Sequence, residues 1–507
     1  MLRATYRSAP VVAPPGDVPV HEAVMHWAAY CPAAPALSDA GMAVDYGELA
    51  SRVRATAEWL RTLGIARGER ILIVAENSVA FATLVLGAHR AGIATVLENA
   101  RRAPAETDAI HAHCAPRYTL FVLDGSGDAT VHAARVGAQI RDDSPAGRVA
   151  VLAGIVDTRA PHDGGVPPAA IIYTTGTTGQ PKGVMLPERA LRFIASQMRA
   201  LRRVTPHDCV YAVLPATHVM GLASVLLGGL ASGAHVHLVA RFSPHECIDA
   251  LARHRVTMLQ GAPAMFAKLV DYCRAQRIAQ VPGVRFIGSG GAPIDPGVKR
   301  DAEHLFGVPL HNGYGLTEAA STCWTRVDED NTDDTVGRAL PGVELRIAAT
   351  PPDTDVGELW VRGPNVMSGY FRDPQRTADV LGADGWFNTQ DLARLGADGR
   401  VYIVGRTKDM IIRSGFNVYP LEIELTLSTH PDVLHCAVLG RAVKGNEEIV
   451  AFVELAQGAR ASTDELAAFL AQRLSPYKRP AQIVVMASLP VAANGKVLKS
   501  ALVVPQA

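Results

Sequence analysis

Short apolar runs alternate with amphipathic stretches through roughly the first 400 residues, and this alternation is what most constrains the fold. Apolar residues recur at helical spacing over Leu49–Leu63 and Val79–Arg90, whereas Arg70–Ala75 and Gly92–Leu97 have the composition of short buried strands. Another strand is expected at Arg285–Gly288, before a glycine-rich turn. Strands that alternate with helices in this way predict an α/β fold built on mainly parallel sheets.

The pattern changes near residue 340, where a smaller β-rich subdomain is expected. Val343–Ala348 and Glu358–Arg362 alternate apolar and polar residues, as strands with one buried face do. After Gly405 the chain predicts a compact α+β unit, with strands at 410–412, 433–439 and 450–455 and helices at 420–428 and 462–474. We therefore predict two domains, a large one over 1–407 and a small one over 408–507.

The composition narrows the class of protein. Of 507 residues 48% are hydrophobic, which is enough for several cores, and 49 Lys and Arg balance 49 Asp and Glu. Nucleic-acid binders carry a basic excess, so no nucleic-acid partner is expected. The seven cysteines are scattered without a C-x-x-C pair or a zinc-site spacing, which favours reduced thiols in a cytoplasmic protein.

One stretch, Val219–Ala240, is long and apolar enough to raise the question of a membrane span. Three glycines interrupt it, at positions 228, 229 and 233, and polar and apolar residues alternate near its end. A buried helix, a glycine turn and a strand are therefore expected there, with no integral membrane segment. The N-terminal residues lack the apolar core of a signal peptide and predict a loose arm.

The stretch YTTGTTGQPKGVML, at Tyr173–Leu186, is poorly suited to a core because glycine costs backbone entropy and every threonine hydroxyl needs a partner. Its glycines let the backbone approach a ligand, and its lysine adds a positive charge. Pro181 and Gly183 flank that lysine and depart from the P-loop pattern, which disfavours kinase-like chemistry. A polyphosphate-binding loop and a flexible surface loop both fit the composition. The residues concerned are Thr174, Thr175, Gly176, Thr177, Thr178, Gly179 and Lys182.

Together with six other motifs, this loop resembles a known family. Tyr173–Gly183 is similar to the signature loop of the adenylate-forming superfamily, which includes acyl-CoA synthetases, adenylation domains of peptide synthetases and firefly luciferase. The resemblance covers nearly the whole chain and implies the architecture of that family, with a mobile C-terminal domain. The other motifs follow in the family's order: GSGGAP (288–293), NGYGLTE (312–318), GELWVRGPNVMSGY (357–370), GWFNTQDLA (385–393), GRTKDMIIRSGFNVYPLEIE (405–424) and NGKVLK (494–499).

The resemblance implies a two-step ligase reaction that uses ATP, Mg²⁺ and coenzyme A. A carboxylate attacks the α-phosphorus of ATP to give an acyl-adenylate and pyrophosphate, and a thiol then displaces AMP. Both steps gather negative charge, so such a site needs cations and oriented hydrogen-bond donors.

The same resemblance implies nucleotide-binding roles. Glu318 and Thr174 are similar to the Mg²⁺ ligands, Thr317 to the α-phosphate contact, and Tyr314 to the residue that stacks on adenine. Read from local sequence alone, Glu318 would be a surface or helix-start residue. The family usually has glycine before the ribose-binding aspartate, where this chain has Gln390. The remaining implied contacts are Gly290, Gly291, Ala292 and Gly315 around adenine, and Asp391 and Arg406 at the ribose or a phosphate; a helix cap is the alternative for Asp391.

A moving C-terminal domain is also implied. Lys496 resembles the lysine that reaches the substrate carboxylate and the α-phosphate during adenylation. Lys408 occupies the hinge position between the domains. Rotation about this hinge would withdraw Lys496 and bring the loop of Ser414, Gly415 and Phe416 to the pantetheine channel of CoA.

His218 matches the histidine that acyl- and aryl-CoA synthetases place near the acyl carboxylate, although a lone histidine beside apolar residues is usually a core residue. The acyl-pocket residues carried over from the family are small or apolar and uncharged. They would serve a second carboxylate poorly, and Gly313 is expected to leave room. A monocarboxylic acid with an aromatic or medium-chain aliphatic tail is therefore expected. These residues are Val219, Met220, Gly288, Gly313, Ala320 and Ser321.

Other interpretations of the sequence remain open. The chain could adenylate an acid and load it onto an acyl carrier protein, or it could be a nucleotide-binding relative without ligase activity. A luciferase-like oxygenase rests on superfamily analogy alone. The sequence does not give the acid, and it allows a homodimer.

Overall fold

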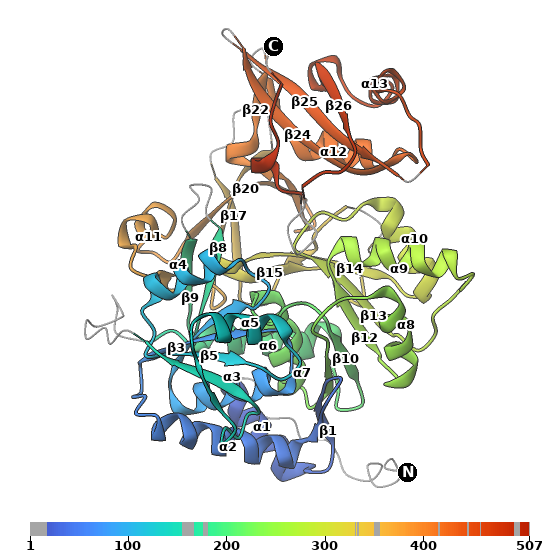
Figure 1. Cartoon of the computed structure of the whole chain (residues 1–507). Helices are drawn as coiled ribbons and strands as arrows, with labels where there is room; N and C mark the ends of the chain where they lie inside the picture. Colours follow the sequence, from blue (N-terminus) through green and yellow to red (C-terminus); the bar gives the residue numbers. More distant parts are fainter. Residues whose placement is uncertain are drawn as a thin grey trace.

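The computed structural model describes residues 18–154, 167–175, 181–329, 331, 334–348, 355–413, 416–443, 446–456, 458–490 and 497–505. Two large sheets dominate it, one of eight strands and one of nine (Figure 1). The eight-stranded sheet runs in the order β19 (Gly369–Tyr370), β9 (Pro181–Leu186), β8 (Ala170–Thr175), β4 (Ala94–Asn99), β3 (Arg70–Ala75), β5 (Tyr118–Val122), β7 (Val149–Ala153) and β6 (Gln139–Arg141). The nine-stranded sheet runs in the order β16 (Arg338–Ala339), β15 (Ala320–Trp324), β14 (Leu310–Leu316), β13 (Phe286–Gly290), β12 (Met258–Gly261), β10 (Cys209–Ala212), β11 (His235–Leu238), β1 (Pro35–Ser38) and β2 (Ala43–Asp45).

Both large sheets are parallel in the middle and antiparallel at the edges. Strands β8, β4, β3 and β5 pair in parallel, as do β14, β13, β12, β10, β11 and β1. The prediction of an α/β fold with mainly parallel sheets is therefore confirmed. The antiparallel edges arise from hairpins such as β8–β9, which sequence alternation did not reveal.

Helices and sheets alternate in five layers, as the clusters of buried side chains between them show. The central layer lies between the two sheets and contains α1 (Val20–Tyr30), α2 (Tyr46–Thr62), α3 (Val79–Ala91), α6 (Glu188–Arg202) and α7 (Gly228–Ala231). The outer face of the eight-stranded sheet carries α4 (Pro104–Cys114) and α5 (Gly127–Arg135). The outer face of the nine-stranded sheet carries α8 (Pro244–Arg253), α9 (Pro263–Ala275) and α10 (Pro296–Phe306).

The helix boundaries follow from capping. Asp45 begins α2 by accepting a hydrogen bond from the Glu48 amide, and Ser78 does the same for α3 at Phe81. Gly92 ends α3 in the left-handed region at φ 73°, where a side chain would be strained. This cap explains why β4 begins two residues later than the predicted strand at Gly92.

The apolar stretch Val219–Ala240 folds into a π-helix over Met220–Leu227 (η1), then α7 and β11. The expected order of helix, turn and strand is confirmed, but Gly228 and Gly229 are helical and only Gly233, at φ 76°, makes the turn. In the part of the chain that the structure describes, no helix is long and apolar enough to cross a bilayer.

A smaller antiparallel sheet follows, as predicted for the β-rich subdomain. It consists of β17 (Glu344–Ala348), β18 (Val356–Arg362), β20 (Phe387–Leu395) and β21 (Val401–Arg406), with α11 (Pro374–Val380) beside it. Short 3₁₀ turns in the described residues include η2 (Thr317–Ala319), η3 (Thr407–Asp409) and η4 (Pro476–Lys478).

Beyond η3 the chain forms separate small sheets, drawn in orange and red at the top of Figure 1. The elements are β22 (Ile411–Arg413) paired with β23 (Phe416–Val418), α12 (Pro420–Ser428), the sheet β24 (Val433–Val443), β25 (Asn446–Leu455) and β26 (Gln482–Met486), α13 (Thr463–Ala471) and η5 (Lys499–Ala501). Ser462 and Glu465 form a reciprocal capping box at α13. The predicted α+β character of this part is confirmed.

Candidate functional site

Three polar side chains meet where the eight-stranded sheet approaches η2. The Lys182 ammonium lies 2.7 Å from Glu318 Oε1 and donates to the Tyr370 hydroxyl at 3.0 Å. Tyr370 in turn donates to the same carboxylate oxygen at 2.9 Å. Glu318 is 7% exposed, so this carboxylate is buried, whereas the Lys182 side chain is half-buried. Such a buried pair is costly to form unless its remaining atoms have partners.

The β8–β9 hairpin places a hydroxyl beside this cluster. Thr174 is paired directly opposite Lys182 in the ladder, and opposite residues of antiparallel strands project to one face. The Thr174 hydroxyl is buried and has no hydrogen-bond partner among the described residues. Thr175 is the last residue of β8. The other loop candidates, Gly176, Thr177, Thr178 and Gly179, lie outside the described residues.

Hydrogen bonds from another segment of the chain hold the turn that carries Thr317 and Glu318. Asn365, fully buried, donates to the carbonyls of Ala319 at 2.7 Å and Ser321 at 3.2 Å. The Met367 amide donates to the Glu318 carbonyl at 2.8 Å. Glu318 is therefore a buried, held carboxylate, and the surface reading of this residue is wrong.

A second polar cluster joins Tyr314, Asp391 and Arg406. The Tyr314 hydroxyl donates to Asp391 Oδ2 at 2.5 Å, and Arg406 Nε donates to Oδ1 at 3.0 Å. Asp391 and Arg406 are register partners in β20 and β21, whereas Tyr314 comes from β14. Burial and the Asp391 charge raise the pKa of Tyr314 well above its ordinary value. Asp391 lies inside a strand, so it is not a helix cap.

The residue before Asp391 has an unusual backbone. Gln390 lies at φ 59°, in the left-handed region that favours glycine. Its amide donates to Asn388 Oδ1 at 2.8 Å, which holds this conformation. The chain therefore adopts here, with a glutamine, a backbone conformation that glycine adopts easily.

Glycines at the ends of β13 and β14 bring backbone close to backbone. Gly291 lies at φ 84° with open space where a Cβ would be. At Gly315 a Cβ would fall 1.9 Å from the Ala320 carbonyl oxygen, so no side chain fits. Gly290 ends β13 and Ala292 follows in the next turn. A flat group can lie against such a surface.

His218 precedes the π-helix and keeps contact with solvent although protein surrounds it densely. Desolvation, and to a smaller extent the cations Arg102 and Arg101, lower the pKa of His218 to about 4. The imidazole is therefore neutral at pH 7. It is not the satisfied core histidine that local sequence suggested, because the residue is exposed to solvent.

The predicted acyl residues gather on the face of β13 and β14 that α6 and η1 cover. Gly290 and Gly313 are register partners, and a Cβ on Gly290 would lie 3.3 Å from the Met220 Cε. Val219 and Met220 lead into η1, while Ala320 and Ser321 begin β15. Ala320 itself lies at φ 43°, a strained position for a residue with a side chain.

The room expected at Gly313 is filled. A Cβ there would lie 1.8 Å from Trp324 Cε3, and a Cβ on Gly288 would lie 3.1 Å from Trp324 Cζ2. The indole of Trp324, from β15, thus packs where those side chains are missing. The expectation of open space at Gly313 is wrong, because an aromatic side chain 11 residues along the chain occupies it.

The residues predicted for the hinge and the CoA loop lie beyond β21. Lys408 is exposed in η3. Phe416 begins β23, is 54% exposed and stacks on Tyr477 with ring centres 4.7 Å apart. Ser414, Gly415 and Lys496 lie outside the described residues.

The residues present fit the implied magnesium nucleotide. In the described ranges no group of three His, Cys, Asp or Glu could hold a metal. Mg²⁺ usually takes only one or two protein ligands and fills the rest with phosphate and water. The buried Glu318 carboxylate and the unpartnered Thr174 hydroxyl provide that short donor set.

Sequence reasoning missed several residues that hold these clusters. Tyr370 and Asn365 lie in a recognised motif, but nothing in their spacing revealed that they bind Glu318 and its turn. Trp324 was missed because only the β14–β15 pairing brings it to Gly313. The aromatic character of Trp324 near NGYGLTE was the one available signal.

Comparisons with known proteins bear on both parts of the chain. The family model for the AMP-binding enzyme matches residues 24–371, and that for its C-terminal domain matches residues 422–496. A feruloyl-CoA synthase from Amycolatopsis is 32% identical over 96% of this chain and 97% of its own length. A sulfoacetate–CoA ligase from Cupriavidus necator is 31% identical over 90% and 92%. The o-succinylbenzoate coenzyme A synthetase of Bacillus subtilis, solved with ATP and magnesium, superposes with a TM-score of 0.81 at 26% identity, covering 96% and 99%.

Proposed function

The chain belongs to the AMP-binding enzyme family, and from this premise we propose how its own residues carry out the family's reaction. It is an AMP-forming acid–CoA ligase, which uses ATP to convert a carboxylic acid to acyl-AMP and pyrophosphate. The CoA thiol then displaces AMP to give the thioester. The residues, the acid and the domain motion below are the parts we propose.

In our proposal the Lys182–Glu318 cluster is the phosphate end of the site. Glu318 and Thr174 would hold Mg²⁺, which when bound offsets phosphate charge and orients the phosphates. Lys182 then turns from Glu318 toward a phosphate oxygen, while Tyr370 keeps its hydrogen bond to the carboxylate. Thr317, one residue before Glu318, donates its hydroxyl to the α-phosphate. Support comes from the 2.7 Å pair of Lys182 and Glu318, the observation that carries this proposal.

The Tyr314–Asp391–Arg406 cluster is assigned to the nucleoside. Ribose hydroxyls replace the Tyr314 hydroxyl as donors to Asp391, and Arg406 keeps its hydrogen bond to that carboxylate. The tyrosine ring is then free to stack on adenine, with Gly290, Gly291, Ala292 and Gly315 against the other edge of the base. Burial supports this role, because Asp391 is 5% exposed and presents both oxygens toward partners.

His218 is proposed to orient the reacting carboxylate. Because its pKa lies near 4, the ring is neutral at pH 7 and donates one N–H without adding a cation. The carboxylate therefore keeps its charge and its nucleophilicity while its direction is fixed.

We propose a monocarboxylic acid with an aromatic or medium-chain aliphatic tail. Relatives act on acids as different as ferulate and sulfoacetate, so the family alone does not fix the acid. The apolar Val219 and Met220 and the glycines at 288 and 313 support an apolar tail. An acyl carrier protein is the alternative thiol, and the test below separates it from CoA.

The domain assignment remains our proposal: residues 1–407 bind ATP and acid, and 408–507 rotate about Lys408. No sheet of the described residues includes strands from both sides of η3. One pose brings Lys496 to the α-phosphate, and the other brings the Ser414–Phe416 loop to CoA. A homodimer and a cytoplasmic location are also proposals, tested by sedimentation and cell fractionation.

Pyrophosphate exchange into ATP tests the first half-reaction. A panel of aromatic and aliphatic acids is assayed for exchange, then for thioester formation with CoA or with a carrier protein. We expect acid-dependent exchange, and thioester with CoA alone. Exchange with no acid of the panel would contradict the proposed acid class, and thioester on carrier protein alone would contradict the acceptor.

Glu318→Gln tests the magnesium site. We expect exchange to fall about 100-fold or more, by analogy with loss of a transition-state contact, and the Mg²⁺ concentration for half-maximal rate to rise. Tyr370→Phe is the matched control, since it removes a hydrogen bond to the same oxygen but keeps the carboxylate. An unchanged Mg²⁺ requirement in Glu318→Gln would rule out this ligand.

A further inference from the structure

A fully buried arginine lies behind the acyl wall. Arg202, the last residue of α6, is 1% exposed, and its Nη1 donates to Gln260 Oε1. Its guanidinium carbon lies 4.1 Å from the centre of the Trp324 ring and 5.5 Å from that of Phe286. Within the described ranges no carboxylate forms an ion pair with it. Burial lowers the pKa of Arg202 to about 9, so it still carries a charge at pH 7.

The groups around Arg202 are hydrogen-bond donors without acceptors. Its Nε and Nη2, the Gln260 Nε2 and the Trp324 Nε1 are all buried and have no partner in the part of the chain that the structure describes. A buried donor left unpaired destabilises the fold, and an unpaired buried charge does so more strongly. The two aromatic faces offset part of this cost through cation–π contact. What the cluster lacks is an acceptor, preferably an anionic one.

The donors adjoin the residues assigned to the acid. Gln260 is the register partner of Gly288, and Trp324 packs against both Gly288 and Gly313. Gly290 lies next to the nucleotide loop. On the same strand, Gly288 lies on the same face and contacts Trp324, and Arg202 lies against Trp324. Met220 lies over Gly290, and its flexible side chain can move aside for a tail.

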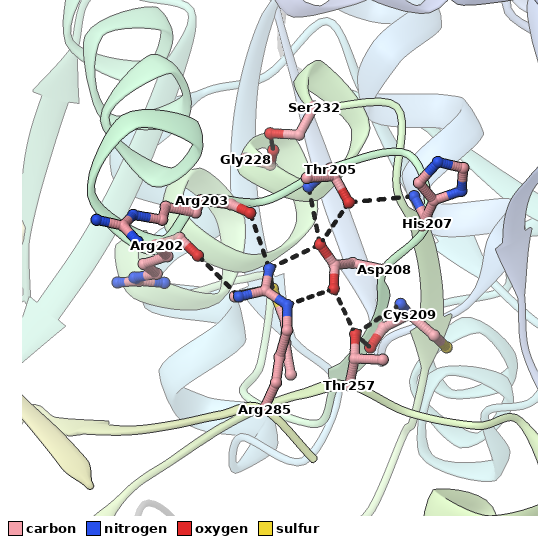
Figure 2. Close-up of polar contacts among 11 residues, drawn as sticks. Arg202, Arg203, Thr205, His207, Asp208, Cys209, Gly228, Ser232, Thr257 and Arg285 are labelled. Carbon is pink, nitrogen blue, oxygen red and sulfur yellow. Dashed lines mark hydrogen bonds and ion pairs between the residues drawn. The ribbon is translucent and has the colours of Figure 1, made fainter. Parts of the chain in front are cut away.

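Arg202 is held in place by a network at the end of α6 (Figure 2). Arg285 donates to the carbonyls of Arg202 and Arg203 at 3.2 and 2.9 Å, and binds both oxygens of Asp208 at 2.7 Å. Thr257 donates to the same aspartate at 2.7 Å. These bonds satisfy the exposed carbonyls at the helix end, so the donor cluster is preorganised.

We propose that Arg202, Gln260 and Trp324 form a subsite for the far end of the acid, and that this end carries a hydrogen-bond-accepting oxygen group. The inference rests on the proposed function, since it places the reacting carboxylate at His218. The guanidinium fork matches a carboxylate, a phenolate or a ketone oxygen, with the amide and the indole as additional donors. The uncharged residues of the acyl pocket argued against a second carboxylate on the acid. At the far end of the acid, beside Arg202, a second carboxylate can bind.

The test uses pairs of acids that differ only at the far end. The pairs are 3-phenylpropanoate with its 4-hydroxy, 4-acetyl and 4-carboxy derivatives, and octanoate with octanedioate. We expect kcat/KM for pyrophosphate exchange to favour at least one oxygen-bearing member by about 100-fold, because a buried donor rejects an analogue that cannot pair with it. The three aromatic derivatives distinguish an anionic from a neutral acceptor.

Arg202→Met should reduce that preference to within about threefold. Gln260→Leu, a milder change, should reduce it in the same direction if Arg202→Met fails to fold. Arg203→Met is the matched control, because the adjacent Arg203 is exposed and pairs only loosely with Asp328 at 3.6 Å.

Two results would overturn the subsite. One is equal or better exchange with every parent acid in the wild-type protein. The other is an unchanged preference in both Arg202→Met and Gln260→Leu, which would leave Arg202 a structural residue. Absence of exchange with any acid is a different result, since it would remove the proposed acid class as well.

Discussion

Single residues at this site adopt states that their types avoid elsewhere. Gln390 lies in the left-handed region, His218 is neutral beside two arginines, and Arg202 is a buried cation without a carboxylate. Each departs from the preference of its type in backbone, protonation or solvation. Such departures concentrate at functional sites, where the surrounding structure enforces them.

Gln390→Gly tests the backbone strain next to Asp391. Glycine adopts φ 59° freely, whereas other residues lose about 1 kcal/mol or more there. The Gln390 amide keeps its bond to Asn388 in the variant. We expect the thermal midpoint to rise by about 1 °C, as calorimetry would measure in this large chain. Gln390→Ala should give no rise, and a midpoint lowered by the glycine would disprove the strain.

Asp391→Asn tests the nucleoside assignment. The amide keeps the size of the side chain but loses the charge that Arg406 and the hydroxyl donors recognise. We expect KM for ATP to rise about 10-fold or more with little change in KM for the acid. Steady-state kinetics at varied ATP measures this. Tyr314→Phe, which removes only the donor to Asp391, should leave KM for ATP within a few-fold.

At the scale of elements, the C-terminal end of α6 both stabilises the helix and positions a residue of the proposed subsite. Helix ends leave four carbonyls without partners, and here Arg285, just before β13, donates to the carbonyls of Arg202 and Arg203. Asp208, just before β10, accepts from Arg285 and holds its guanidinium in place. The helix end in turn places Arg202 against β12 and β15. The π-helix η1 packs beside it and carries Met220 to Gly290. Two helices thus set the inner wall of the acyl site.

Arg285→Met should destabilise the protein by about 3 kcal/mol, because it leaves the buried Asp208 carboxylate without its cation and only with the hydrogen bonds from Thr205 and Thr257. The thermal midpoint should fall by several degrees, and the acid preference should weaken as Arg202 loses its support. Arg274→Met is the control, since Arg274 pairs with Asp301 at the surface. Equal effects of the two substitutions would show that the network contributes nothing special.

At the scale of the whole molecule, the burial of titratable side chains determines how stability changes as pH falls. Four buried or half-buried histidines, His89, His235, His237 and His311, have their pKa lowered to about 4 mainly by desolvation. Their unfolded pKa is about 6.5, so they stabilise the fold fully above pH 6.5 and lose this contribution as pH falls to 4. Glu98 and Glu188, with pKa raised to about 7, act in the opposite direction between pH 7 and 4.5.

The histidines outnumber these carboxyls, so unfolding takes up protons and the free energy of unfolding falls as pH drops from 6.5 to 4.5. We expect the thermal midpoint to fall steadily over this range in calorimetry. His311→Gln should flatten the fall, whereas the exposed His304→Gln should not. A midpoint that is constant from pH 6.5 to 5 would contradict the buried neutral histidines.

Domain rotation predicts that the two half-reactions separate. Lys496→Ala should lower pyrophosphate exchange by about 100- to 1000-fold, as for a lost transition-state contact, yet still convert supplied acyl-adenylate and CoA to thioester. Lys499→Ala is the control with the same change of charge, because Lys499 pairs with Glu424 at 2.7 Å. Equal loss of both half-reactions in Lys496→Ala would exclude two poses.

Local sequence determined whatever depends on residues near each other in the chain. The strand at Arg70–Ala75 and the helix at Pro420–Ser428 fall where their apolar spacing and flanking residues place them. The glycine and threonine pattern and the ordered motifs identified the family, because phosphate binding needs those residue types in contiguous loops.

Tertiary structure alone decided which distant residues meet. Tyr370 reaches Glu318 across 52 positions, Arg285 reaches Arg202 across 83, and Trp324 fills the space over Gly313 through a strand pairing. Strand order and register are set by packing among all layers, so no local pattern encodes them. A cation such as Arg202 looks like any surface arginine until the fold removes water from it, and desolvation is a property of the whole molecule.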